Sequence, residues 1–312
     1  MHTKLKIFGV ITSIGMLIVL LQGALVTKTE SGDGCGATWP FCLGKILPPS
    51  PTTETIIEYS HRAVSGLVGL MIIVFSILAW RAIPHIRETK LMAILSVFFI
   101  AFQGLLGAGA VVFGQSDAVL ALHFGISSLS LTVVILLTVL VFEDGKASVV
   151  QPVVSKGFRN YVIFALVYVY LVIYSGAYVK HTRTTYACGP EFPTCNGELI
   201  PQLTASIFPH YLHRLAGIAT FFIILIMLIW AIRKYRHEPT ILWGSIIAFI
   251  LVTMQLVSGI YVVLTYNTLA FSLLHALIIA LLFATLCYLM MVISRKGFSP
   301  SPKTIKNELL AE

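Results

Sequence analysis

Four histidines recur in the sequence at a fixed spacing, and their side chains have the chemistry of metal ligands. They form two pairs whose members are 62 residues apart: His61 with His123, and His213 with His275. A neutral imidazole nitrogen is a strong ligand for haem iron. Arg62 and Arg214 directly follow the first histidine of each pair, and a guanidinium there could contact a haem propionate through two hydrogen bonds. We therefore expect one haem between the histidines of each pair.

The two pairs differ one helical turn before their first histidine. The first has Glu58 three residues before His61, whereas the second has His210 three residues before His213. Residues at this spacing share one face of a helix. A carboxylate beside a haem ligand could accept a proton, orient water or stabilise a developing positive charge. A glutamate favoured only by the helix dipole is the structural alternative, but the asymmetry favours chemistry in the first pair.

Four of the five cysteines form two close pairs, Cys35 with Cys42 and Cys188 with Cys195. On the oxidising side of a membrane, each pair could form a disulfide that closes a small loop, a constraint worth about 2–3 kcal/mol. A structural staple above the histidines and a redox-active pair both remain open as roles. Cys287 lies in an apolar segment and is expected to be a packing residue.

The elements that carry these residues are long apolar segments. Hydrophobic residues make up 57% of the 312 residues and charged residues 11%, which is too apolar for a water-soluble fold. A helix needs about 20 residues to cross a hydrocarbon layer of about 30 Å. Eight segments meet this requirement and predict an all-α membrane protein: 7–26, 60–80, 91–113, 119–142, 160–179, 210–232, 241–264 and 270–294.

The sequence contains two similar halves, offset by about 152 residues. The repeated positions include both histidine pairs, both cysteine pairs and two glycines, with Gly23 recurring as Gly176 and Gly107 as Gly259. Each half has four predicted helices, so both halves insert with the same orientation. They are then parallel four-helix bundles related by a pseudo-twofold axis along the membrane normal. We expect the halves to be residues 1–148 and 149–312, joined by a short polar segment near Glu143.

The basic residues predict the orientation in the membrane. The net charge is +8, and with the N-terminus inside, 15 Lys and Arg residues lie in inner segments and six in outer ones. The six are Lys28, Lys45, Arg62, Lys180, Arg183 and Arg214. Both termini are therefore expected to be cytoplasmic, and all four paired histidines lie near the outer ends of their helices. This distribution explains the positive charge without a nucleic-acid partner.

Together, these residues resemble the haem A synthase family, in the cysteine-containing type of Gram-positive bacteria. The resemblance covers the whole chain: two related halves, a histidine pair and an outer cysteine pair in each, and Glu-x-x-His only in the first. It implies an oxidoreductase of the cell membrane that oxidises the ring D methyl group of haem O to a formyl group. Successive hydroxylation would give haem A for terminal oxidases, with a haem b relaying electrons.

The resemblance also implies a role for each site residue. His61 and His123 would hold the substrate haem, with Glu58 as the catalytic carboxylate, and His213 and His275 would hold the haem b. Disulfides Cys35–Cys42 and Cys188–Cys195 are implied as well. The expected partners are haem O synthase, cytochrome oxidase assembly factors and a second copy of the chain.

Other functions remain as alternatives. A two-haem cytochrome that exchanges electrons with quinone would use both histidine pairs, but it gives Glu58 no role. A quinone-linked disulfide oxidoreductase would use the cysteines. A transporter is suggested only by the parallel repeat and gives the matched histidines no function.

Overall fold

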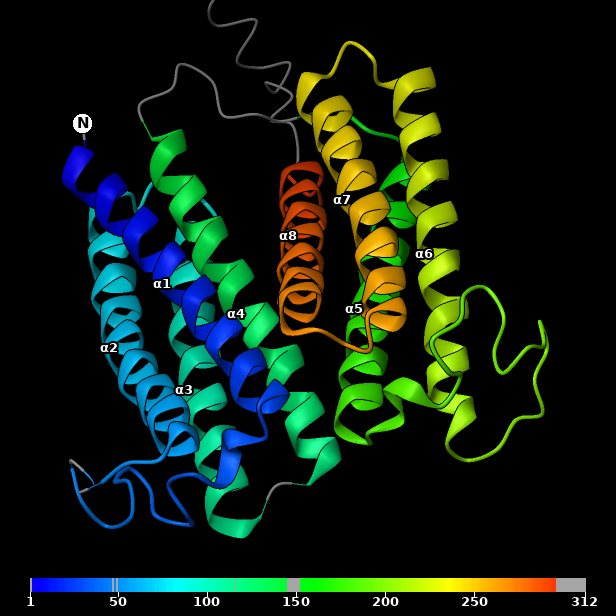
Figure 1. Ribbon diagram of the computed structural model, residues 1–312. Coiled ribbons are helices and arrows are strands. Elements are labelled where there is room, and N and C mark those ends of the chain that lie inside the picture. Colours follow the sequence, from blue (N-terminus) through cyan, green and yellow to red (C-terminus); the bar gives the residue numbers. More distant parts are fainter. Residues whose placement is uncertain (1, 47, 49, 115, 145–151, 296–312) are drawn as a thin grey trace, which may run out of the picture.

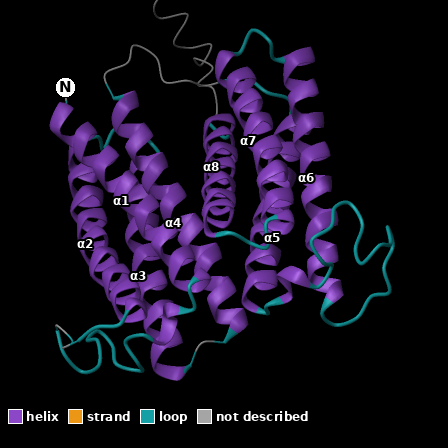
Figure 2. Cartoon of the chain, in the orientation of Figure 1, coloured by secondary structure: helices purple, strands orange, loops and turns teal. Residues whose placement is uncertain are grey.

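The computed structural model describes residues 2–46, 48, 50–114, 116–144 and 152–295. These residues form eight α-helices, each long and apolar enough to span a membrane, and within those ranges the structure has no β-strand (Figures 1 and 2). The helices are α1 (Thr3–Lys28), α2 (Thr53–Ala82), α3 (Thr89–Phe113), α4 (Asp117–Glu143), α5 (Lys156–His181), α6 (Ile207–Lys234), α7 (Pro239–Leu264) and α8 (Leu269–Ile293). The all-α fold with eight spanning segments is confirmed. The expected boundary at residue 148 lies outside the described residues.

The helices extend beyond the apolar segments because polar capping residues determine their ends. Helix α2 begins at Thr53, well before the predicted segment 60–80. The Thr52 hydroxyl accepts a hydrogen bond from the backbone N–H of Thr55 at 3.3 Å, and Ser116 and Ser155 cap α4 and α5 in the same way. The additional turns of α2 place both Glu58 and His61 within the helix.

Each half of the chain is a group of four helices. Helices α1 to α4 pack against one another in sequence and α1 also contacts α4, and α5 to α8 repeat this arrangement (Figure 1). Helix α4 packs against α5 and α8, and α1 also packs against α8. Consequently, α4 and α8 are the most buried of the eight helices. The two halves therefore meet along α1, α4, α5 and α8, of which α4 and α8 each carry one of the paired histidines.

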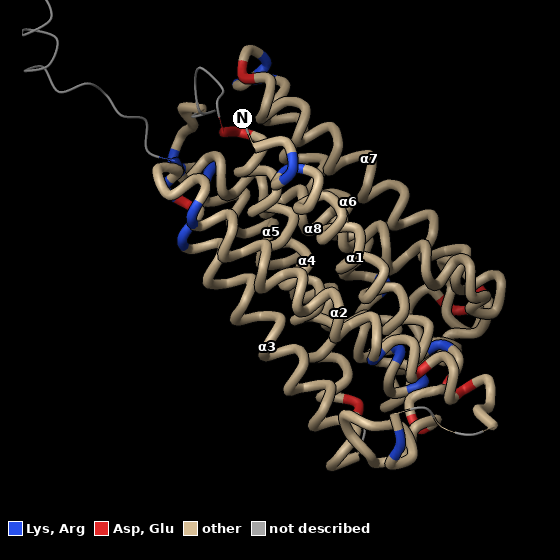
Figure 3. Tube along the Cα trace, turned by 90° about the vertical axis from the view of Figure 1, so that its left-hand side faces the viewer, with Lys and Arg blue, Asp and Glu red and all other residues tan. Residues whose placement is uncertain are grey.

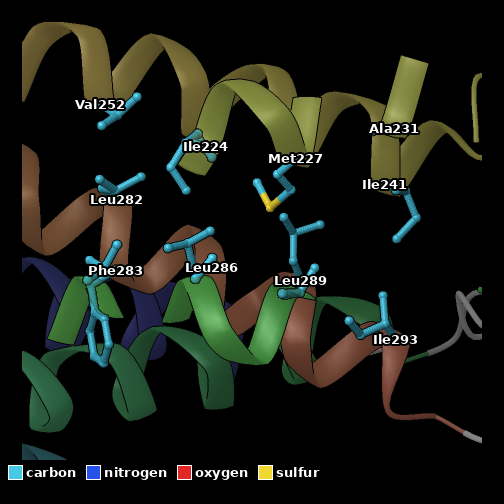
Figure 4. Packing of buried hydrophobic residues seen from close by; sticks show 14 of the residues in the cluster. Ile224, Met227, Ala231, Ile241, Val252, Leu282, Phe283, Leu286, Leu289 and Ile293 are labelled. Atoms are coloured by element: carbon cyan, nitrogen blue, oxygen red, sulfur yellow. The ribbon is translucent and has the colours of Figure 1, made fainter. Parts of the chain in front are cut away.

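Branched and long apolar side chains fill the interior of the second half. Ile224 and Met227 of α6 lie opposite Leu286 and Leu289 of α8, as Figure 4 shows. These four side chains are almost completely buried. Close packing of this kind fixes the relative positions of the helices, and thus of the histidines that they carry.

Charged residues gather at the two ends of the helices, whereas the middle is nearly free of them (Figure 3). At the end opposite the disulfide loops, the buried Arg295 donates to both carboxylate oxygens of Glu143, at 3.2 and 2.7 Å, and to Glu88 at 3.2 Å. Burial alone would lower the pKa of Arg295, but hydrogen bonds and charges from Glu143 and Glu88 raise it above its ordinary value. This network joins the end of the second half to the first half.

The two long loops, after α1 and α5, have the same local structure. Each begins with a short 3₁₀ helix, η1 (Ser31–Asp33) or η2 (Thr184–Tyr186), and continues into a disulfide. The bonds are Cys35–Cys42 and Cys188–Cys195, so both expected pairs are within bonding distance. Both disulfides are completely buried and cover the helix ends near the paired histidines.

Candidate functional site

The four paired histidines lie on α2, α4, α6 and α8, near the ends that carry the disulfide loops. All four are partly buried. Electrostatic interaction links the members of each pair, His61 with His123 and His213 with His275. The fold thus brings together the residues that the sequence paired.

A glycine on the preceding helix lies against each histidine ring. A Cβ atom placed at Gly23 of α1 would be 3.4 Å from Cε1 of His61, and one at Gly107 of α3 would be 3.2 Å from Cε1 of His123. The contacts are closer in the second half, where a Cβ atom at Gly176 would be 2.7 Å from His213 and one at Gly259 would be 3.0 Å from His275. These are the glycines that recur in the sequence. We call the four of them the glycine seats.

Hydroxyl groups fix the imidazoles of the second half. The Ser175 Oγ atom is 2.9 Å from Nδ1 of His213, and the Ser258 Oγ atom is 3.0 Å from Nδ1 of His275. A serine partner at Nδ1 fixes the ring orientation and leaves Nε2 as the atom for metal ligation. The Gln255 side-chain amide is 3.0 Å from Nε2 of His275, which a ligand there would displace. In the first half, the buried Nδ1 atoms of His61 and His123 have no hydrogen-bond partner among the described residues.

A cavity of about 250 Å³ opens beside the second pair. His213, His275, Gln255 and Arg214 line it together with many apolar side chains. The Nη2 atom of Arg214 is buried and has no hydrogen-bond partner in the part of the chain that the structure describes. Apolar walls, two imidazoles and an unpartnered guanidinium nitrogen fit an apolar macrocycle that carries iron and carboxylates. The residues that line this cavity are therefore chemically suited to hold a haem.

Glu58 connects helix α2 to the first disulfide loop. Its carboxylate is buried and accepts a hydrogen bond from the backbone N–H of Cys35 at 2.7 Å. It also forms an ion pair with Arg62, whose Nε atom lies 3.1 Å from Oε1. Nη1 of Arg62 donates to the carbonyl groups of Thr38 and Phe41, both in the same loop. Each guanidinium nitrogen of Arg62 thus has a hydrogen-bond partner within the protein, and the propionate contact expected from the sequence stays a prediction.

In the second half, a histidine takes the position of Glu58, and the arginine is retained. His210 is buried, and its Nε2 atom accepts a hydrogen bond from Nε of Arg214 at 3.2 Å. Arg214 also donates to the carbonyl of Thr194 at 2.9 Å, a contact to the second disulfide loop. The two halves therefore share the arginine-to-loop contact, but among the described residues only Arg62 is hydrogen-bonded to a carboxylate.

Known proteins match the chain over almost its whole length. Residues 6–287 match the family model COX15-CtaA, described as cytochrome oxidase assembly protein. The chain belongs to this family. The heme A synthase of Halalkalibacterium halodurans is 58% identical over 295 residues, which make up 95% of this chain and 99% of that protein. The heme A synthases of Alkalihalophilus pseudofirmus and Shouchella clausii are 56% and 51% identical with the same coverage, so the resemblance found in the sequence is confirmed.

Sequence reasoning missed several residues of this member of the cytochrome oxidase assembly protein family. Ser175 and Ser258 were not found, because neither is repeated in the first half. His181 was not among the predicted site residues, but it is the last residue of α5 and lines the cavity. It also interacts electrostatically with Asp117 and His123 of the first half. The glycine seats could be found from the sequence, since Gly23 recurs as Gly176 and Gly107 as Gly259 at the offset of the repeat.

Proposed function

We propose that the chain is a haem A synthase, which oxidises the ring D methyl group of haem O to a formyl group and so supplies haem A to terminal oxidases. Near-full-length relatives that are named heme A synthase support this activity. One observation supports different roles for the two halves, with a reaction site in the first and a resident cofactor in the second. Both halves have a glycine-seated histidine pair, but within the described part of the chain only the first pair has a buried carboxylate one turn away, and only the second has rings anchored by hydroxyl groups.

The first half, residues 1–148, is the proposed reaction site. His61 and His123 would hold haem O by its iron, and their unpartnered Nδ1 atoms leave the rings free to adjust as substrate enters and product leaves. Glu58 is the proposed catalytic carboxylate. Arg62 and the Cys35 amide hold it in place. Arg62 occupies Oε1 with two nitrogens, whereas Oε2 accepts only the Cys35 amide among the described residues and retains a second lone pair for a proton or a water molecule.

The second half, residues 149–312, is the proposed site of a resident haem b. His213 and His275 would be its axial ligands, oriented by Ser175 and Ser258. Arg214 would donate to a propionate through its unpartnered Nη2 atom. A haem b bound there would supply one-electron transfer. We place the protein in the cell membrane, with the disulfide loops on the outer side.

Coexpression with a source of haem O, followed by chromatography of the extracted haems, tests the activity. We expect haem A to form only when the chain and haem O are both present. If haem b were the only product bound in every preparation and haem O were never converted, the chain would be an electron-transfer cytochrome instead.

Replacement of the carboxylate tests the role of the first half. Glu58→Gln should retain bound haem and lose haem A formation by at least about a hundredfold, since a positioned acid or base contributes about 10²–10⁴-fold. Glu54→Gln is the matched control, because Glu54 is an exposed carboxylate one turn earlier on α2. Normal haem A formation by Glu58→Gln would reduce Glu58 to a structural partner of the loop.

A further inference from the structure

The cavity of the second half is not built by that half alone. Helix α1 of the first half contributes Ala24, Thr27 and Lys28 to its wall, and α4 contributes Phe124. Lys28 is the last residue of α1, at the end of the helix that leads into the first disulfide loop. The first half thus supplies a cation to the site of the second.

The wall of this cavity has an excess of positive charge. Lys28, Lys180 and Arg214 all line it, and no Asp or Glu is among its lining residues. Lys28 and Lys180 interact as like charges. Such an arrangement is unfavourable unless an anion offsets it.

The two carboxylates that act on these cations have other partners as well. Glu30 acts on Lys180, but it is largely exposed and pairs with Arg183 at 3.9 Å. Glu191 acts on Arg214, but its carboxylate accepts hydrogen bonds from Thr194 and from the backbone N–H of Gly197. Neither carboxylate lines the cavity, so the positive charge there is available to a ligand.

We propose that Lys28 and Lys180, together with Arg214, form a binding site for the two carboxylates of the haem b, so that both halves of the chain build this one site. The inference rests on the proposed function, in which the second pair of histidines holds a haem. Charge-assisted hydrogen bonds from two ammonium groups and a guanidinium suit a pair of propionates at the membrane surface. The ligand then ties α1 of the first half to α5 and α6 of the second.

Optical titration of the full chain in detergent tests this site without relying on turnover. The protein carries His61→Ala, so that only the second pair can give a bis-imidazole spectrum. The two probes are ferric haem b and its dimethyl ester, which lacks the carboxylate charges. We expect Lys28→Gln and Lys180→Gln each to weaken haem b binding about tenfold. The ester should bind the parent and both variants equally.

Lys45→Gln is the matched control, because Lys45 lies in an outer loop and does not line the cavity. It should leave both affinities unchanged, and Lys28→Arg should restore most of the loss because it returns the charge. Equal binding of haem b by the parent and Lys28→Gln would overturn the composite site and leave the proposed function intact. An equal loss of ester affinity would also overturn it, by assigning Lys28 a packing role. If the parent gave no bis-imidazole spectrum, the proposed function would fail as well.

Discussion

Substitution of the glycine seats by alanine should weaken haem binding in an order that the contact distances determine. Two carbon atoms pack without strain at about 3.5 Å or more. Relative to that distance, an added Cβ atom is too close by about 0.8 Å at Gly176, 0.5 Å at Gly259, 0.3 Å at Gly107 and 0.1 Å at Gly23. The expected severity therefore decreases from Gly176→Ala to Gly23→Ala.

The hydrogen bonds of the histidine rings increase the difference in expected severity between the two halves. In the second half, His213 cannot move away from a new methyl group without losing its 2.9 Å contact with Ser175. Overpacking of this kind typically costs about 1–3 kcal/mol. If this cost falls on the haem-bound state, haem affinity drops by about 5- to 160-fold. At Gly23 the strain is small, and the higher helix propensity of alanine, about 1 kcal/mol, offsets it.

The measurement is the haem-to-protein ratio of each purified variant, with the bis-imidazole absorbance of the reduced haem. Gly104→Ala is the relaxed control, since a Cβ atom there meets nothing within 4 Å. Gly244→Ala is the strained control, since its Cβ atom would lie 2.5 Å from Leu289, away from every histidine. Gly244→Ala should lower thermal stability and keep the haem spectrum. The reasoning is refuted if Gly176→Ala keeps its haem, or if Gly244→Ala loses haem to the same extent.

Three further predictions concern the surroundings of the sites. Ser175→Ala or Ser258→Ala should weaken haem b binding about tenfold, because loss of a hydrogen bond that orients a ligand typically costs 10–100-fold. Ser175→Thr should restore binding, and optical titration measures both effects. The double variant Cys35→Ser with Cys42→Ser should lose about 2–3 kcal/mol of stability, which is the loop-closure contribution of the disulfide. Chromatography of extracted haems should still detect haem A. Complete loss of haem A in a stably folded variant would favour a redox role for this pair. Arg295→Gln should destabilise the chain by about 3–5 kcal/mol in thermal or denaturant unfolding, because it leaves the carboxylates of Glu88 and Glu143 without their buried partner. An unchanged stability would show that these ion pairs do not hold the two halves together.

The sequence predicted the eight helices because a membrane requires long apolar segments, and this requirement leaves few alternatives. It also predicted which histidines meet, since repeated residues reveal themselves when a chain is compared with itself. Polar helix ends were harder to predict. Hydropathy detects only the apolar part of α2, and the start of this helix at Thr53 depends on the Thr52 hydroxyl, which accepts a hydrogen bond from the backbone N–H of Thr55.

What comparison of the halves could not find is what differs between them. At the repeat offset, Gln22 corresponds to Ser175 and Leu106 to Ser258, so nothing in the pattern marks the hydroxyl groups. The partners of Arg62 were equally hidden. A cation next to a proposed ligand suggests a propionate, and only the folded loop shows that its own carbonyl groups and Glu58 take up the guanidinium.

The arrangement of the wall residues explains how electrons could pass between the proposed sites without a separate carrier. On α1, Gly23 lies against His61, and the next residue, Ala24, lines the cavity of the second half. On α4, His123 belongs to the first pair, and the next residue, Phe124, lines the same cavity. Neighbouring residues in a chain have Cα atoms about 3.8 Å apart, and successive side chains point to different faces of a helix. The two proposed sites therefore share α1 and α4 as walls. In the proposed division of labour, the hydroxyl groups beside His213 and His275 suit the second pair to retaining its haem, and Glu58 in the place of His210 suits the first pair to reacting with one.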